Sequence, residues 1–161
     1  MKRILLATLL GMFTLGLAAA HAQVRANAIG AKLGLYFDGS KPMIGVNGEI
    51  PFTSELDFEP AAELVFGIQN TTLVILDANG RYSFNLQGSE VRPYLLGGLG
   101  VGVSFVSVNG TSKSDTDFRL NLGGGMVFNS RSLIQYWAGL KVFVLSKSSD
   151  VGIQGGVNFY L

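Results

Sequence analysis

The sequence predicts an all-β fold, a single eight-stranded antiparallel up-and-down barrel that spans a membrane. Three observations support this prediction: polar and apolar residues alternate along the chain, charged residues make up only 14% of it, and it contains 22 glycines. Soluble domains average about 25% charged residues. After residue 22, no apolar run approaches the roughly 20 residues that a membrane-spanning helix needs. A closed barrel is the other way to satisfy the backbone hydrogen bonds inside lipid.

The N-terminal segment has the layout of a cleaved secretory signal peptide. The basic start Met1-Lys2-Arg3 precedes an apolar run, and Ala20-His21-Ala22 supplies small residues at the −3 and −1 positions. The alternative is a transmembrane anchor, for which the apolar run is short. We therefore expect two parts, a signal peptide over residues 1–22 and a barrel domain over residues 23–161.

Composition excludes several kinds of site. Removal of the signal would take away His21, the only histidine, and the chain contains no cysteine. Zinc sites with His ligands, thiolate nucleophiles, His general bases and disulfides are therefore not expected in the exported protein, and no cofactor or metal is predicted. Its nearly balanced charge gives no support for nucleic-acid binding, which usually needs a basic stripe.

Alternation with period two, typical of strands with two unlike faces, begins at residue 28. Clusters of turn-forming residues, such as Asp38-Gly39-Ser40 before Pro42, separate the first alternating segments. In chain order, the first four predicted strands and their outward apolar residues are 28–37 with Ile29, Leu33 and Phe37; 43–52 with Ile44, Val46 and Phe52; 57–67 with Phe58, Leu64 and Phe66; and 72–84 with Leu76, Tyr82 and Phe84.

Pro60 makes the third segment the weakest of these predictions. Proline cannot donate to a β-ladder and usually marks an edge, a strand start or a bulge. Residues 60–66 could also form a helical turn, and a strand here could begin at Ala61. We predict a strand over 57–67.

The second half of the chain alternates in the same way, with glycine common on the polar face. The remaining predicted strands and their outward apolar residues are 91–105 with Leu95, Leu99 and Phe105; 117–128 with Phe118, Leu122 and Phe128; 133–145 with Ile134, Tyr136 and Leu140; and 150–161 with Ile153, Val157 and Phe159. Eight strands of about ten residues suit a bilayer crossed by tilted strands. An even number of strands returns both ends of the chain to the same side of the membrane, which is expected to be the periplasmic side.

All charged residues between the strand ends fall on the polar faces, which we interpret as a charged lumen. The predicted lumen charge network consists of Lys32, Glu49, Glu59, Glu63, Asp77, Arg81, Arg119 and Lys141. Four acids match four bases, which favours pairing, since an unpaired buried charge costs several kcal/mol, roughly. The network is therefore interpreted as a salt-bridged plug, and an ion-conducting lumen is the alternative. Trp137 and Phe143 alternate in step with Lys141 on the polar face of their strand, so we expect them to face inward and pack the lumen. A small apolar ligand site there is a second interpretation.

Aromatic residues on the apolar faces gather near both ends of the predicted strands, and the middles are mainly aliphatic. Two aromatic girdles around an aliphatic band are typical of a membrane barrel. A soluble lipocalin-like barrel in the periplasm, with its apolar face inward, is the alternative.

Two glycine-rich strands carry a family resemblance. Arg92-Pro93-Tyr94-Leu95-Leu96-Gly97-Gly98-Leu99-Gly100 and Asn121-Leu122-Gly123-Gly124-Gly125-Met126 resemble strands of small outer-membrane β-barrel proteins of the opacity and OmpA/OmpX-like type. The alternating C-terminus, with Val157, Phe159 and Leu161, resembles the signature by which such barrels are recognised for assembly, although the usual last residue is Phe. The resemblance implies the outer membrane of a Gram-negative-type bacterium, contact with lipid and lipopolysaccharide, and insertion by the barrel-assembly machinery. We expect a barrel without the periplasmic domain of the larger OmpA proteins.

The expected function is that of a non-enzymatic outer-membrane protein, structural or surface-exposed, and monomeric because a closed barrel has no strand edge that needs a partner. The alternatives are a narrow porin-like channel, the soluble barrel described above and a lipid-modifying enzyme. Glu59, Glu63 and Asp77 could serve acid/base chemistry, but we interpret them as partners of the lumen cations. The longest predicted outward loop, residues 106–116, is where contact with a host molecule or a phage is expected.

Overall fold

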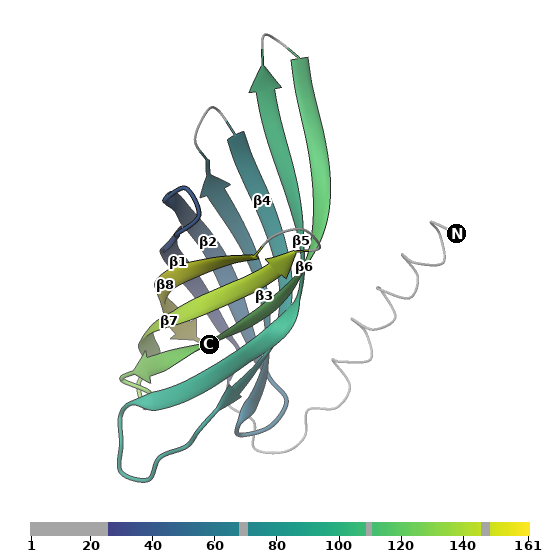
Figure 1. Ribbon diagram of the computed structural model, residues 1–161. Helices are drawn as coiled ribbons and strands as arrows, with labels where there is room; N and C mark the ends of the chain where they lie inside the picture. Colours follow the sequence, from purple (N-terminus) through teal and green to yellow (C-terminus); the bar gives the residue numbers. More distant parts are fainter. Residues whose placement is uncertain (1–25, 68–70, 109–110, 146–148) are drawn as a thin grey trace, which may run out of the picture.

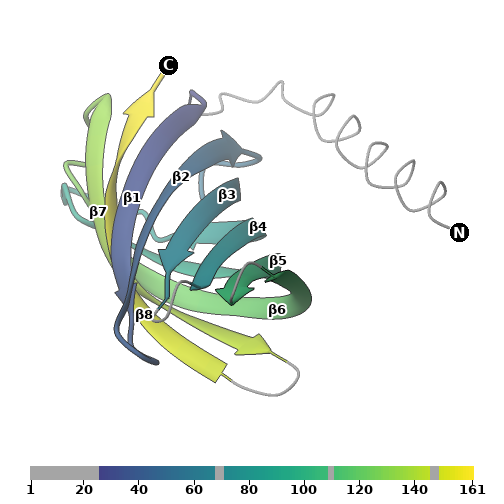
Figure 2. The same ribbon diagram turned by 90° about the horizontal axis from the view of Figure 1, so that it is seen from above.

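The computed structural model describes residues 26–67, 71–108, 111–145 and 149–161, which form a closed antiparallel barrel. Each strand pairs with the next in the chain, and β1 also pairs with β8. Figures 1 and 2 show the strands arranged around one axis. The strands are β1 Ala28–Tyr36, β2 Lys41–Pro51, β3 Leu56–Phe66, β4 Thr71–Ser83, β5 Arg92–Val108, β6 Thr111–Phe128, β7 Ile134–Leu145 and β8 Ser149–Tyr160. The predicted eight-stranded fold is confirmed.

The register of the strands fixes the width of the barrel. One circuit of paired residues runs from Phe118 through Val101, Leu76, Ala62, Val46, Ala31, Val157 and Tyr136 to Phe128. The circuit returns to β6 ten residues from its start, so the shear of the barrel is ten. Strands in closed barrels tilt by about 35–45°, and eight of them leave an interior that side chains can fill.

The outer wall is apolar, and the interior is polar. Exposed side chains of the wall include Leu33 at 68% and Leu99 at 66%, whereas the alternate residues of the same strands are largely buried. Exposed aromatic residues lie near the chain termini (Phe52, Phe84, Phe128 and Phe159) and near the opposite end (Phe37, Phe66, Phe105 and Phe118). This is the arrangement of a membrane barrel, and it contradicts the alternative of a soluble barrel with an apolar interior. We call the two ends of the barrel the terminal end and the far end.

β3 is a full strand in spite of Pro60. Its pairing with β4 is continuous, and Pro60 lies opposite Ala78. Pairing with β2 is interrupted between Asn47↔Ala61 and Ile50↔Phe58 and continues in the same register. The ring nitrogen of proline has no hydrogen to donate toward β2, so the ladder loses a contact there without a change of register.

The prediction of a long loop over residues 106–116 was wrong. β5 continues to Val108 and β6 begins at Thr111, so that Val108 pairs with Thr111 across a two-residue connection. In Figure 1 the β5–β6 hairpin rises beyond the other hairpins of the far end. The polar composition of this segment hides the strand because neither face is apolar. The missed signal was the Asn-Gly pair at 109–110, the commonest sequence of a two-residue hairpin turn.

The predicted signal peptide, residues 1–22, lies outside the described residues. Within the part of the chain that the structure describes, no helix has the length and apolar character needed to cross a membrane.

Candidate functional site

The interior of the barrel contains all eight residues of the predicted lumen charge network. None of them is more than 6% exposed, because each occupies an inward position on its strand. The network comprises Lys32 on β1, Glu49 on β2, Glu59 and Glu63 on β3, Asp77 and Arg81 on β4, Arg119 on β6 and Lys141 on β7. The structure brings seven of them together in two separate groups of ion pairs.

The first group surrounds the carboxylate of Glu63. Lys32 Nζ lies 2.7 Å and Lys141 Nζ 2.8 Å from Glu63 Oε1, and the hydroxyl of Tyr36 donates to Glu63 Oε2. Lys141 also pairs with Asp77. Two lysines thus share two carboxylates, and four strands on different sides of the barrel are joined through their side chains.

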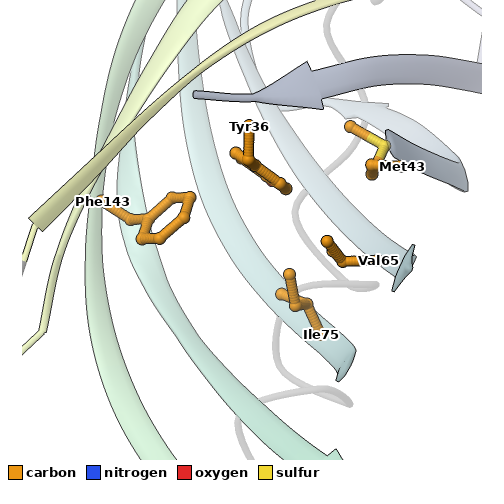
Figure 3. Close-up of a cluster of buried hydrophobic side chains, with 5 residues drawn as sticks. All are labelled: Tyr36, Met43, Val65, Ile75 and Phe143. Atoms are coloured by element: carbon orange, nitrogen blue, oxygen red, sulfur yellow. The ribbon is translucent and has the colours of Figure 1, made fainter. Parts of the chain in front are cut away.

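A layer of apolar side chains lies toward the far end from this group. Tyr36, Met43, Val65, Ile75 and Phe143 come from five strands and point toward one another inside the barrel, as Figure 3 shows. The rings of Tyr36 and Phe143 meet edge to face with centroids 4.9 Å apart. Each of the five is at most 4% exposed. This layer separates the first ion-pair group from the far end of the barrel.

The second group lies nearer the terminal end and is centred on Arg81. Its Nη1 pairs with Glu49 and lies 3.3 Å from Glu59 Oε2. The guanidinium carbon of Arg81 also lies 4.1 Å from the ring centroid of Tyr94. Asn158 Nδ2 donates to Glu49 Oε1 at 2.6 Å, and the hydroxyl of Tyr160 donates to Glu49 Oε2. The C-terminal strand is thereby tied into this group.

Amide side chains fill part of the interior around the second group. Asn121 Nδ2 donates to Asn79 Oδ1 at 3.0 Å, and Asn47 Nδ2 donates to Asn158 Oδ1 at 3.1 Å. Trp137, which parity placed inside, donates from Nε1 to the same Asn158 oxygen at 3.3 Å. These hydrogen bonds satisfy polar atoms that would otherwise be costly to bury.

Arg119 is the member of the predicted network that joins neither group of ion pairs. Its guanidinium carbon lies 4.5 Å from the ring centroid of Phe143, a cation–π contact. Within the described part of the chain, Nε and Nη1 of Arg119 have no hydrogen-bond partner. The sequence therefore predicted that this charge is inside but did not predict that it stacks on an aromatic ring.

Sequence reasoning missed two buried charges and several inward apolar residues. Asp57 is 1% exposed and Arg92 is 6% exposed, and both lie near the terminal end of the barrel. Arg92 Nη2 lies 3.5 Å from Gln135 Oε1. Parity could have found both, since Asp57 shares a face with Glu59 and Arg92 shares one with Tyr94. The inward apolar residues that were missed are Met43, Ala61, Val65, Ile75, Leu96 and Val127.

Glycines next to the large inward side chains give them room. A Cβ atom on Gly139 would lie 2.5 Å from the hydroxyl of Tyr94, and one on Gly125 would lie 2.8 Å from it. Tyr94 therefore lies across a notch that these two glycines form on the neighbouring strands. Tyr94 packs there with Leu96, Val127 and Trp137 as a second buried cluster.

The chemistry available in this interior is that of charge neutralisation. Glu49, Glu59, Glu63 and Asp77 each contact a lysine or arginine. Among the described residues, no group of three or more His, Cys, Asp or Glu side chains could hold a metal ion. The arrangement is therefore suited to filling and bracing the barrel.

Several solved structures share this fold. The N-terminal β-barrel domain of Pseudomonas aeruginosa OprF superimposes with a TM-score of 0.72 at 17% identity, over 86% of this chain and 100% of that one. Neisserial surface protein A gives a TM-score of 0.63 at 18% identity, over 87% and 98%. Ail, the attachment invasion locus protein of Yersinia pestis, gives 0.61 at 18% identity, over 85% and 97%.

The fold also supports an enzyme, since the outer membrane enzyme PagL matches with a TM-score of 0.52 at 13% identity, over 83% of this chain and 99% of that one. At these identities the likeness shows the fold alone. No curated protein matches the sequence. A family model described as "Outer membrane protein beta-barrel domain" matches residues 6–142. With most of its length covered by that model, the chain belongs to the outer membrane protein β-barrel family.

Proposed function

We propose that this small outer-membrane barrel is a non-enzymatic structural protein whose lumen does not conduct ions. The observation that supports the proposal is the filled interior. Two groups of ion pairs connect strands across the lumen, and the apolar layer of Tyr36, Met43, Val65, Ile75 and Phe143 lies between them and the far end. An eight-stranded barrel is just wide enough for side chains to fill. An ion that crossed would have to displace paired charges and then pass apolar side chains.

Planar-bilayer recording of the purified, refolded protein tests this proposal. We expect no discrete conductance steps in 1 M KCl. Replacing the apolar layer with small residues, as in Met43→Ala combined with Phe143→Ala, should introduce steps or raised current noise if that layer is what closes the lumen. Regular steps in the unmodified protein would instead establish the alternative, a narrow channel.

The proposal excludes catalysis on the basis of the interior chemistry. A general base or nucleophile must be free to exchange a proton with a substrate. The carboxylates of Glu49, Glu59, Glu63 and Asp77 are engaged with lysine and arginine, and the expected exported chain contains no histidine. Unchanged lipid A, measured by mass spectrometry after overexpression, is the expected result.

The route to the membrane is part of the proposal. The signal peptide over residues 1–22 would direct export, and Val157, Phe159 and Leu161 would be read by the barrel-assembly machinery. Phe159 is 47% exposed and Leu161 78% exposed, so both are accessible from outside the folded barrel. The assembled monomer would then contact lipid and lipopolysaccharide through its apolar wall, and neither a cofactor nor a nucleic acid through any surface.

Deleting Leu161 together with Phe159→Ala is expected to lower the amount of protein in the outer-membrane fraction severalfold. These side chains face outward, so refolding of the same variant in detergent should be nearly unchanged. The measurement is the heat-shifted band in SDS electrophoresis of each preparation. An equal loss in cells and in detergent would mean that the residues act through stability and are not an assembly signal.

A further inference from the structure

Arg119 carries a buried positive charge that, among the described residues, no carboxylate balances within ion-pair distance. The residue is 4% exposed, and its Nε and Nη1 have no hydrogen-bond partner. The neighbouring ion-pair group around Glu63 is already balanced, because its two lysines share two carboxylates. The part of the lumen that contains Arg119 and this group therefore carries one net positive charge.

The aromatic contact of Arg119 does not replace a counter-ion. The ring of Phe143, which Figure 3 shows in the apolar layer, covers the guanidinium at 4.5 Å. The N–H donors of a guanidinium lie in its plane, so a ring stacked on its face leaves them unpaired. Because an unpaired buried charge is strongly destabilising, a ligand that accepts hydrogen bonds and carries one negative charge would be favoured here.

Two glycines of β5 make room for the Arg119 side chain and direct it toward the far end. A Cβ atom on Gly100 would lie 2.9 Å from Cγ of Arg119, and one on Gly102 would lie 2.8 Å from Nη2. Since β5 runs from the terminal end to the far end, the guanidinium is the part of the side chain nearest the far end. On β6 the next inward residue in that direction, Asp117, is exposed. An ion from the water at the far end therefore reaches the guanidinium without crossing the apolar layer.

Asp77, the buried carboxylate nearest to Arg119, is already engaged. Its Oδ2 pairs with Lys141. Its Oδ1 would lie 2.1 Å from a Cβ atom on Gly100, beside the aliphatic carbons of Arg119 and away from Gly102, where the guanidinium lies. The structure thus leaves the guanidinium open to a ligand that is not part of the lumen network.

The exposed charges on β6 limit which anions fit. Asp115 and Asp117 are exposed and have the parity of Arg119, and Lys113 has the same parity in the sequence. These three residues together carry one net negative charge at the entrance. A polyanion would be repelled there and would meet only one buried cation. The guanidinium is also nearly covered, which favours an ion of halide size over a larger oxyanion.

We propose that Arg119 binds a small monovalent anion, chloride, at the far-end mouth of the lumen. The ion accepts hydrogen bonds from the guanidinium and neutralises the one charge that the lumen network leaves over. The apolar layer of Tyr36, Met43, Val65, Ile75 and Phe143 lies beneath the site, so the ion enters and leaves by the same end. The proposal therefore does not depend on whether the lumen conducts.

The test is an NMR titration of the full barrel, refolded in phosphatidylcholine nanodiscs, in which sodium chloride replaces sodium gluconate at constant ionic strength. Saturable shifts of the backbone amides of Gly100, Gly102 and residue 119 are expected, with half-saturation below about 0.1 M chloride. Sodium sulfate should give no saturable shift. A linear response to chloride, or an equal saturable response to sulfate, would overturn the proposal.

Two variants tie the response to Arg119. Arg119→Met should abolish the saturable shifts, and it should still fold, because it removes a charge that has no ion-pair partner among the described residues. Chloride should raise the urea midpoint of the unmodified protein and leave that of Arg119→Met unchanged, since a ligand that binds only the folded state stabilises it. Arg131→Met, at an exposed arginine outside the lumen, is the matched control and should keep both responses.

Asp117→Asn tests the electrostatics of the entrance. Removing a carboxylate two residues along the strand, about 7 Å away, should tighten chloride binding about twofold. Saturable shifts or chloride protection that persist in Arg119→Met would overturn the proposal, as would weaker chloride binding in Asp117→Asn.

Discussion

Arg81→Ala is expected to lower the free energy of unfolding by about 3–5 kcal/mol, the cost of breaking a buried ion pair from one side. Arg81 is 1% exposed and pairs with both Glu49 and Glu59. The variant would leave two carboxylates buried without a cation, and it would also remove the contact with Tyr94. The measurement is the urea midpoint of unfolding in lipid vesicles, with the heat-shifted band in SDS electrophoresis as a second readout.

Lys41→Ala is the matched control for this prediction. Lys41 pairs with Asp38 at 3.4 Å near the surface, where an ion pair contributes about 0–1 kcal/mol. A triple variant separates lost charge balance from lost packing. Arg81→Met with Glu49→Gln and Glu59→Gln removes the charges together, and it should recover most of the stability that Arg81→Ala loses. Equal midpoints for Arg81→Ala and Lys41→Ala would contradict the interpretation of the interior as a charge-paired plug.

Gly125→Val is expected to cost about 3 kcal/mol or more, at the upper end of the range for overpacking a well-packed interior. A Cβ atom at this position would lie 2.1 Å from the carbonyl oxygen of Ala138 and 2.6 Å from the Cα of Gly139. Both are backbone atoms of β7, so the side chain cannot be accommodated by a rotamer change. The expected result is a large loss of the heat-shifted form and a lower urea midpoint.

Gly97→Val on the neighbouring strand β5 provides the control. A Cβ atom there would meet its nearest neighbours, Leu122 Cδ2 and Asn121 O, at 3.8 and 3.9 Å. Valine favours strands and glycine weakens them, so this variant should be neutral or slightly stabilising. If both variants have the same effect, the close approach of β6 to β7 is not what requires glycine at residue 125.

Several features could be predicted from the sequence because each depends on parity along one strand. Successive side chains of a strand point to opposite faces of the sheet. One charged residue therefore identifies the polar face, and every second residue along the strand lies on that same face. Once the charges and the aromatic girdles indicate that the polar face is the inner one, alternation predicts that Lys32, Arg119 and Trp137 lie inside the barrel. Asp57 and Arg92 follow the same rule and were missed only because they lie at strand ends.

The β5–β6 hairpin shows where parity reasoning fails. Residues 114–117 are exposed, and the composition of the whole segment 111–117 is that of a loop. What holds this segment as a strand is its ladder with β5, from Val103↔Thr116 to Val108↔Thr111. This pairing depends on the turn and on the partner strand β5, and it does not need an apolar face on β6. Period-two alternation of polar and apolar residues therefore did not reveal the strand.

The sequence by itself determined the number of strands, the face of each strand that meets lipid and the inward position of the eight predicted lumen charges, because these follow from local alternation and from composition. The tertiary structure decided which charges pair. Lys141 reaches Glu63 and Asp77 across the barrel, Arg81 takes Glu49 and Glu59, and Arg119 stacks on Phe143. These partners lie on strands far apart in the chain, and only the register and the shear of the closed barrel bring them to the same height.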